Sequence, residues 1–199
     1  MLLRNSNQEA YVSQTMEAVV IGTSAGGIEA LHFLLPHIPP ACAGAFFVVQ
    51  HILPESDSSF VRLLQEKCRV KVREACNTDE IIPGTIYFAP PDYHLMVEKD
   101  FTLCVVVDEK INYSRPSIDV LFETAAEAFT KRLTGILLTG VNRDGSSGLK
   151  RIKELGGKTI VQSPEDAAFP EMPFSALKLF NPDKILTLEQ IASYLANLR

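Results

Sequence analysis

The sequence predicts an α/β protein of three layers. A doubly wound, mostly parallel sheet is expected, with an antiparallel hairpin and with helices on both faces. Short runs that are apolar throughout alternate along the chain with segments whose apolar residues recur at helical spacing. Fully apolar runs are typical of strands buried on both sides, as in parallel sheets. Two further runs flank Lys99-Asp100, which indicates the hairpin.

The expected strands are separated by turns and loops rich in glycine, proline and small polar residues. They cover about residues 17–22, 45–50, 70–73, 85–89, 94–98, 101–107, 133–138 and 158–162. The expected helices have recognisable limits: Pro36 follows the first, Ser117 is a start signal, and Gly156-Gly157 closes another. They lie at residues 27–35, around 60–64, at 116–132, up to 155, within 164–179 and at about 188–198.

Length and composition describe one ordinary globular domain. The 199 residues allow a domain at residues 16–199 after an N-terminal tail at residues 1–15. Hydrophobic residues make up 46% of the chain and charged residues 22%. The net charge is −5, and lysine and arginine form no basic stripe. Nucleic acid is therefore not an expected partner.

The chain has no apolar run near the ~20 residues that a membrane-spanning helix requires, and no signal-peptide pattern. We therefore expect a cytoplasmic protein that is not inserted in a membrane. The four cysteines are scattered, without a C-x-x-C pair, which favours free thiols that pack as small apolar residues. Because no Cys/His spacing suits a metal, neither a metal nor another cofactor is expected.

A glycine-rich turn follows the first expected strand. Residues 22–26 read Gly-Thr-Ser-Ala-Gly, a literal G-x-S-x-G, in which a serine occupies the sharp turn between a strand and a helix. The following helix would present its positive dipole end and free N–H groups near the serine oxygen. Ser24 is therefore a candidate nucleophile.

Two other polar residues follow expected strands in the same way. His51 comes after the strand at 45–50, and Asp144 lies in the glycine-rich turn after the strand at 133–138. Parallel strands bring their carboxyl ends to one edge of the sheet, where ligands bind. Ser24, His51 and Asp144 would then form a triad, with the imidazole as base and the carboxylate orienting it. The chain order differs from that of α/β-hydrolases, in which the acid precedes the histidine.

Each residue also has a simpler interpretation. His51 could be a hydrogen-bonded histidine at a strand end, and Asp144 a turn residue or helix cap. The turn at 22–27 could instead cradle a phosphate or nucleotide, although its glycine spacing is not G-x-G-x-x-G and no P-loop lysine accompanies it. It is the combination of three such residues that favours a hydrolase.

Further motifs occur along the chain. They are Ile21–Gly27, Val49–His51, Ala89–His94, Ser114–Asp119, Gly140 with Asp144-Gly145, and Met172-Pro173. In this order they resemble the catalytic domain of the CheB chemotaxis methylesterases, and the similarity runs from about residue 17 to residue 197.

The resemblance implies an α/β sandwich that hydrolyses glutamate γ-methyl esters on chemoreceptors and releases methanol, with glutamine deamidation at the same site. By position, Ser24 would be the nucleophile, His51 the base and Asp144 the orienting carboxylate. Backbone N–H donors for the oxyanion would come from Ala25 and from the 140–142 turn, with Val141 as the candidate. The partner would be a methylated cytoplasmic receptor helix.

Two departures from the family pattern bear on activity. The family usually has Gly-Met-Gly where this chain has Gly140-Val141-Asn142, so the site rim has a shorter apolar side chain and an extra amide. If position 142 requires a positive φ, asparagine is among the least costly substitutes for glycine. Also, about 16 residues precede the first strand, too few for the receiver domain of longer members. Regulation is then expected to be absent or to come from a separate protein.

Two features remain open. Arg115, in the loop before the 116–132 helix, could contact substrate or could be structural. The loops at 54–58 and 164–173 are expected walls of the substrate groove. The alternative function is a CheB-like binding module in a chemosensory pathway, with chemistry weakened by the change at Val141 and Asn142.

Overall fold

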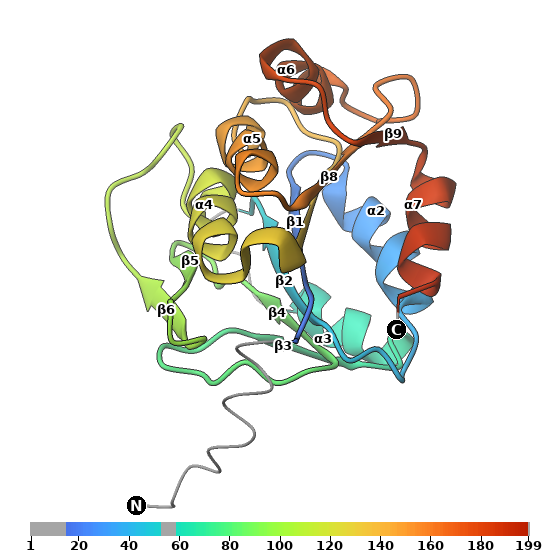
Figure 1. The fold of residues 1–199 in the computed structure, drawn as a ribbon. Helices are drawn as coiled ribbons and strands as arrows, with labels where there is room; N and C mark the ends of the chain where they lie inside the picture. Colours follow the sequence, from blue (N-terminus) through green and yellow to red (C-terminus); the bar gives the residue numbers. More distant parts are fainter. Residues whose placement is uncertain (1–14, 53–58, 199) are drawn as a thin grey trace, which may run out of the picture.

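The computed structural model describes residues 15–52 and 59–198 (Figure 1). Its strands are β1 (Ala18–Thr23), β2 (Ala45–Gln50), β3 (Lys71–Glu74), β4 (Thr85–Phe88), β5 (His94–Val97), β6 (Leu103–Val106), β7 (Leu133–Leu137), β8 (Lys158–Gln162) and β9 (Lys184–Leu186). Its α-helices are α2 (Gly27–Leu34), α3 (Ser59–Lys67), α4 (Ile118–Phe129), α5 (Ser146–Glu154), α6 (Glu171–Leu179) and α7 (Leu188–Ala196). The expected tail at 1–15 and the expected wall at 54–58 fall almost wholly outside these described ranges.

The described residues form a seven-stranded parallel sheet in the order β3-β4-β2-β1-β7-β8-β9. β5 and β6 form a separate antiparallel hairpin. The predicted α/β class, with its parallel sheet and hairpin, is therefore confirmed. The winding reverses at β1, which lies between β2 and β7, and ligands of doubly wound sheets bind at such a reversal.

Helices cover both faces of this sheet, and residues of β1 alternate between the two cores. Val20 belongs to the core under α4 and α5, whereas Ile21 belongs to the core under α2, α3 and α7. Figure 1 shows α4 and α5 on one side of the sheet and α2 and α7 on the other. This alternation is the two-residue period of a strand, and it explains why β1 is buried throughout.

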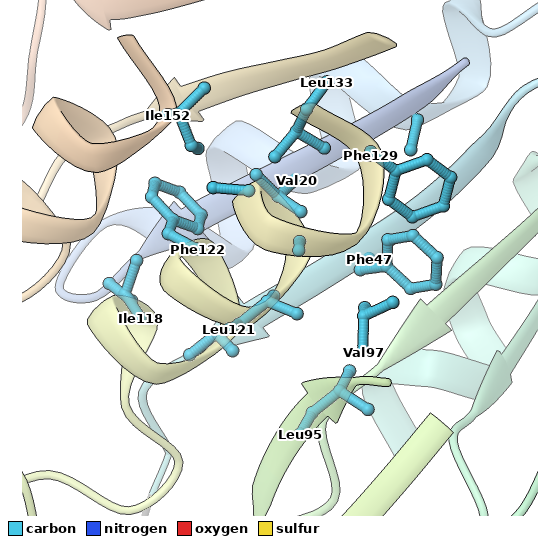
Figure 2. Packing of buried hydrophobic residues seen from close by; sticks show 14 of the residues in the cluster. Val20, Phe47, Leu95, Val97, Ile118, Leu121, Phe122, Phe129, Leu133 and Ile152 are labelled. Atoms are coloured by element: carbon cyan, nitrogen blue, oxygen red, sulfur yellow. The ribbon is translucent and has the colours of Figure 1, made fainter. Parts of the chain in front are cut away.

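The core beneath α4 also supports the end of the sheet where the strands terminate. Phe122 and Ile118 of α4 point toward β1, and Phe129 packs on Phe47 of β2, with ring centroids 6.1 Å apart (Figure 2). A Cβ on Gly22 would lie 2.2 Å from Ile118, so glycine there permits this close packing. Helix α4 is thereby held against the last residues of β1.

The structure adds an element that the sequence reading missed and shortens others. β9 pairs in parallel with β8 at the edge of the sheet, but it has only three residues and two of them are exposed. It therefore lacks the continuous apolar run that identifies the central strands. Helix α4 begins at Ile118 after its N-cap Ser117, and residues 130–132 form a 3-10 turn instead of its last turn.

None of the four cysteines, all of which lie in the described part of the chain, forms a disulfide. Cys42 and Cys68 are buried among apolar residues, but Cys76 is exposed. Burial raises the pKa of the Cys68 thiol to about 11. The interpretation of the thiols as packing residues therefore applies to the first two and not to Cys76.

Candidate active site

Ser24 follows the last residue of β1, and its backbone is fixed on two sides. Its N–H donates to the carbonyl of Thr139 over 3.0 Å, and its carbonyl accepts from the N–H of Gly27 over 2.9 Å. Gly26, the N-cap of α2, has a φ of 75°, a left-handed conformation that favours glycine. The serine is thereby held on a tight strand-to-helix turn.

A buried glutamine ties this turn to the end of β2. Nε2 of Gln50 donates to the carbonyl oxygens of Ser24 and of His51, each over 2.9 Å. The N–H of His51 donates to the carbonyl of Thr23 over 3.1 Å. Because Gln50 and Thr23 are register partners in neighbouring strands, Ser24 and His51 leave the sheet side by side.

His51 and Asp144 are brought together although they are 93 residues apart in the chain. Nε2 of His51 lies 2.9 Å from Oδ2 of Asp144, whose side chain is fully buried. A carboxylate only accepts hydrogen bonds, so Nε2 carries the hydrogen and the lone pair of the neutral ring lies on Nδ1. The ring nitrogen that can accept a proton is thus Nδ1, whereas in the usual triad it is Nε2.

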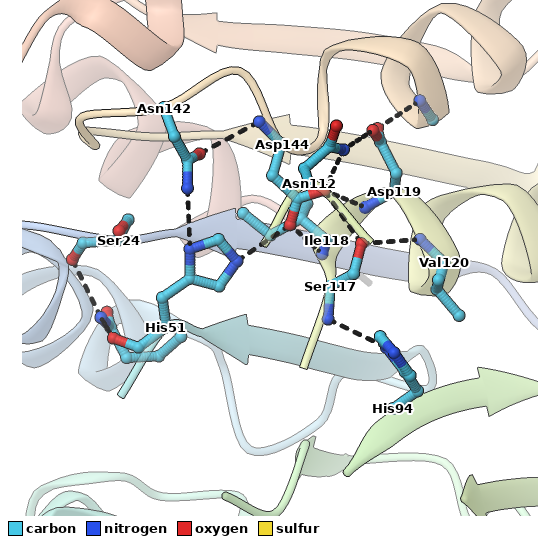
Figure 3. A network of polar contacts seen from close by, with 12 residues as sticks. Ser24, His51, His94, Asn112, Ser117, Ile118, Asp119, Val120, Asn142 and Asp144 are labelled. Atoms are coloured by element: carbon cyan, nitrogen blue, oxygen red, sulfur yellow. Dashed lines mark hydrogen bonds and ion pairs between the residues drawn. The ribbon is translucent and has the colours of Figure 1, made fainter. Parts of the chain in front are cut away.

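Asp144 belongs to the turn before α5, and its carboxylate lies at the N-terminus of α4. Figure 3 shows several donors converging on it there. Its carboxylate accepts five hydrogen bonds, from His51 Nε2, Asn112 Nδ2, Ser117 Oγ and the N–H groups of Ile118 and Asp119. Burial opposes ionisation, but the bonds from His51, Ile118 and Asn112 outweigh it and lower the pKa of Asp144. The carboxylate therefore stays ionised beside the imidazole.

Sequence reasoning did not single out the residues that hold Asp144. Ser117 caps α4, accepting from Val120 and donating to Asp144, and its own N–H donates to Nδ1 of His94 over 3.2 Å. His94 is buried, and its Nε2 donates to the carbonyl of Glu109. His94 lies in the motif Ala89–His94 and Ser117 in the motif Ser114–Asp119. Membership of these motifs was the only sequence signal that the two residues matter.

Half-buried Asn112 and buried Asp119 form a second polar pair beside Asp144. Asn112 Nδ2 donates to Asp119 Oδ2 over 2.9 Å and to Asp144 Oδ1 over 3.1 Å. Burial, followed by the charges of Asp144 and Glu123, raises the pKa of Asp119 to about 6, although the N–H of Gly148 donates to it. No sequence signal distinguishes Asn112 from an ordinary loop residue.

Asn142 contacts the other nitrogen of the His51 ring. Its Nδ2 lies 3.4 Å from Nδ1 of His51, and its Oδ1 accepts from the N–H of Asp144 over 3.0 Å. Within the described residues, Ser24 Oγ makes no hydrogen bond to the ring. Asn142 is not among the described residues with a positive φ, so the backbone here does not require glycine.

Two backbone N–H groups lie in the turns that carry Ser24 and Gly140. Among the described residues, neither the N–H of Ala25 nor that of Val141 has an intramolecular acceptor. The two turns that carry them are in contact, because a Cβ on Gly140 would lie 3.0 Å from Ser24 Cβ and 2.5 Å from Met172 Cε. Both N–H groups are therefore unpaired within the part of the chain that the structure describes.

This arrangement of serine, histidine and aspartate can be compared with known proteins. A family model described as CheB methylesterase matches residues 19–195. The chain belongs to the CheB methylesterase family. The similarity expected from the sequence is therefore confirmed over nearly the whole chain.

Relatives and a solved structure agree with this assignment. A protein-glutamate methylesterase/protein-glutamine glutaminase of Chromobacterium violaceum is 36% identical over 189 residues, covering 93% of this chain and 52% of its own. A Leptospira interrogans protein, provisionally named for the same two activities, is 47% identical over 182 residues, covering 92% of this chain and 94% of its own. The crystal structure of the Thermotoga maritima CheB methylesterase catalytic domain matches with a TM-score of 0.87 and 30% identity, covering 93% of this chain and all of that one.

In this CheB-type fold, Arg115 is bound within the protein. Its guanidinium donates twice to Asp92 Oδ1 and once to Oδ2 over 2.9–3.0 Å, and it also donates to the carbonyl of Asp108. The Arg115 side chain is 17% exposed. These contacts support the structural interpretation that the sequence left open beside substrate binding.

The segment at 164–173, whose last three residues begin helix α6, contacts the turn at Gly140. The N–H of Gly140 donates to the carbonyl of Phe169, and the N–H of Met172 donates to the carbonyl of Gly140, each over 3.0 Å. Phe169 and Val141 are partly exposed apolar residues, at 41% and 56%. This CheB-type site therefore has an apolar rim beside the two turns.

Residues 15–52 and 59–198 contain no group of three or more side chains placed to hold a metal ion. Over the same ranges, no helix combines the length and the apolar character needed to cross a bilayer.

Proposed function

We propose that this protein hydrolyses glutamate γ-methyl esters on chemoreceptors and releases methanol, with Ser24, His51 and Asp144 as its catalytic residues. The observation that carries the proposal is the 2.9 Å bond between His51 Nε2 and Asp144 Oδ2 at the reversal of the sheet, directly beside Ser24. Membership of the CheB methylesterase family supports the substrate class.

In the first step, Ser24 Oγ attacks the ester carbonyl carbon. Nδ1 of His51 accepts the hydroxyl proton, and Asp144 stabilises the imidazolium through Nε2. The proton then passes from Nδ1 to the departing methoxide, so that methanol leaves and a γ-glutamyl ester on Ser24 remains. Contacts between a catalytic serine and its base often tighten only when substrate binds, so the missing Ser24–His51 bond is compatible with this step.

Stabilisation of the oxyanion is assigned to the N–H groups of Ala25 and Val141. Both lack an intramolecular acceptor among the described residues, and the Ser24 and Gly140 turns are in contact. Removing one donor of this kind typically costs about 10²–10³ in turnover. The burial of Met172 against Gly140 keeps the second turn in place.

In the second step, water attacks the acyl-enzyme with His51 again as base, and Ser24 is released with a glutamate carboxylate on the receptor. A glutamine side chain at the same position would release ammonia in place of methanol. The name of the Chromobacterium violaceum relative includes a glutaminase activity, which supports testing both.

The partners follow from this chemistry. The substrate is a methylated receptor helix, and nucleic acid has no part in the reaction. We place the reaction in the cytoplasm, where cysteines without disulfides are stable and where the receptor helices lie. Regulation by a separate protein belongs to the same proposal.

One observation favours a second function, a binding module with weakened chemistry. The side chain of Asn142 contacts the ring nitrogen that must accept the serine proton. Such a module would bind the receptor helix without cleaving its esters. The buried, fully hydrogen-bonded Asp144 favours the enzyme instead, because a binding surface does not require an ionised carboxylate behind its histidine.

The test is methanol release from a methylated receptor fragment, with Ser24→Ala as the control. Turnover by the unmodified protein that Ser24→Ala abolishes supports the esterase. A folded protein that binds the fragment in calorimetry yet releases no methanol would overturn the esterase and support the binding module. A parallel fragment with glutamine at the ester positions, assayed for ammonia, tests deamidation.

A further inference from the structure

The His51 ring is bound at both nitrogens. Nε2 donates to Asp144 over 2.9 Å, and Nδ1 lies 3.4 Å from Nδ2 of Asn142, as Figure 3 shows. Since Nε2 carries the hydrogen, Nδ1 of the neutral ring is an acceptor with one lone pair. The contact with Asn142 is therefore made by the lone pair that the chemistry needs.

The orientation of the Asn142 amide is fixed independently. The backbone N–H of Asp144 lies 3.0 Å from Oδ1 of Asn142. An N–H only donates, so the oxygen must occupy that position and the NH₂ group must face the ring. Asn142 is therefore a hydrogen-bond donor to Nδ1, and it also closes the turn that carries Asp144.

These two facts create a conflict with the proposed reaction. One lone pair cannot accept from Asn142 and from Ser24 at the same time. Ser24 Oγ has no hydrogen bond to the ring within the described residues, whereas the Asn142 amide does. In the protein without substrate, Nδ1 of His51 therefore accepts a hydrogen bond from the neutral amide of Asn142.

We propose that Asn142 caps the basic nitrogen of His51, so that Ser24 is activated only after the amide has released the ring. The inference rests on the proposed function, because a cap has a consequence only if Nδ1 acts as the base. Asn142 is then a positioning residue that lowers the reactivity of Ser24. At 3.4 Å the bond is longer than the usual 2.9–3.0 Å, so it is weak and readily broken.

The size of the effect follows from the strength of one neutral hydrogen bond. Removing such a bond is expected to raise the reactivity of Ser24 by about 2- to 10-fold, the range for a neutral pair. An effect of this size tunes the rate without abolishing it. It is measured as a change in the rate at which Ser24 reacts, because the cap acts on the base.

Two variants separate the cap from the turn. Asn142→Ser keeps an oxygen that can accept from the N–H of Asp144, but its shorter side chain cannot reach the ring. Asn142→Asp also keeps that oxygen, but it replaces the donor with an acceptor that holds a proton on Nδ1. The cap predicts that the serine variant reacts faster than the unmodified protein and that the aspartate variant reacts more slowly. A residue that only closes the turn predicts equal rates for all three.

The reaction to follow is labelling of Ser24 by a fluorophosphonate, which needs no receptor. The Oγ–P bond forms, the P–F bond breaks, and the hydroxyl proton passes to His51 and leaves with fluoride. Ser24→Ala is the control for labelling elsewhere. Equal labelling of the unmodified protein and Asn142→Ser, or slower labelling of the serine variant, would overturn the proposal.

A second readout does not depend on activity. The ¹⁵N NMR resonance of His51 Nδ1 should shift in Asn142→Ser because a pyridine-type nitrogen loses its donor, while the Nε2–H resonance bound to Asp144 persists. An unchanged Nδ1 resonance would overturn the cap. If the shift occurs but Ser24 is never labelled and no methanol is released, the contact is established and it is the esterase proposal that fails.

Discussion

Asp119 and Asp144 share one donor, the side-chain amide of Asn112, which lies 2.9 Å from Oδ2 of the first and 3.1 Å from Oδ1 of the second. Their pKa values nevertheless move in opposite directions. That of Asp119 is raised to about 6, chiefly by burial, whereas the bonds to Asp144 outweigh burial and lower its pKa. Asp144 accepts five donors and is the charged member of the pair.

The raised pKa of Asp119 predicts a pH-dependent stability. The folded protein holds this proton more tightly than the unfolded chain, so the free energy of unfolding falls as pH rises from about 4 to about 6. The loss from this group is at most about 3 kcal/mol. In Asp119→Asn the loss is absent, so the stability of the variant relative to the unmodified protein should increase over that range. Urea unfolding from pH 4 to 8 measures this, and a difference independent of pH would contradict it.

Asp144→Asn should abolish most of the proposed turnover while Ser24 remains in place. An amide would present an NH₂ group to donors at one of its two positions, and it has no negative charge to stabilise the imidazolium of His51. We expect methanol release to fall by about 10³–10⁴-fold. Combining the change with Ser24→Ala should cause little further loss, because the residues act as a unit. Additive losses in the double variant would argue against a shared step.

Ser117→Ala tests the cap that also holds Asp144. Losing an N-cap costs about 1 kcal/mol, and here one donor to Asp144 is lost as well. Thr187→Ala is the matched control, because Thr187 caps α7 through the same kind of bond. Both variants should lose similar stability in thermal unfolding, but only Ser117→Ala should lower turnover. Equal activities would show that Ser117 acts on the helix alone.

Gly140→Ala should disturb the contact between the two turns. The added Cβ would lie 2.5 Å from Met172 Cε and 3.0 Å from Ser24 Cβ, so both side chains must shift. Gly44→Ala is the control. Gly44 precedes β2, at the end of that strand far from His51, and its added Cβ would lie no closer than 3.2 Å to another atom. We expect the first variant to lose turnover by about 10²-fold, as for a displacement of about 1 Å at a catalytic group, and the second to keep it. Full turnover by Gly140→Ala would exclude a tightly packed oxyanion turn.

A double-mutant cycle on Arg115 and Asp92 tests the structural interpretation of the arginine. The three short bonds predict a coupling of about 1–2 kcal/mol in the free energy of unfolding. If Arg115 is structural, Arg115→Ala and Asp92→Ala should change KM to similar small extents. A KM that rises only in the arginine variant, without coupling, would favour a substrate contact.

Local patterns in the sequence predicted most of the strands and helices of the fold. The apolar runs that became β1, β2 and β7 are buried throughout, and strands buried on both sides of a sheet are predominantly apolar. Parallel strands share their carboxyl edge, so the sequence could also place Ser24, His51 and Asp144 at one edge. The short edge strand β9 was not predicted, because its residues are mostly exposed and form no apolar run.

Tertiary structure decided the contacts that local periodicity does not encode. Only the strand order puts β1 between β2 and β7, and only the fold joins His51 to a carboxylate 93 residues away. The base nitrogen, the raised pKa of Asp119 and the amide of Asn142 on the ring each depend on which group faces which across such distances. The sequence by itself determined which residues lie at the edge of the sheet; the tertiary structure decided which of their atoms meet, because hydrogen bonds depend on positions in space and not on spacing along the chain.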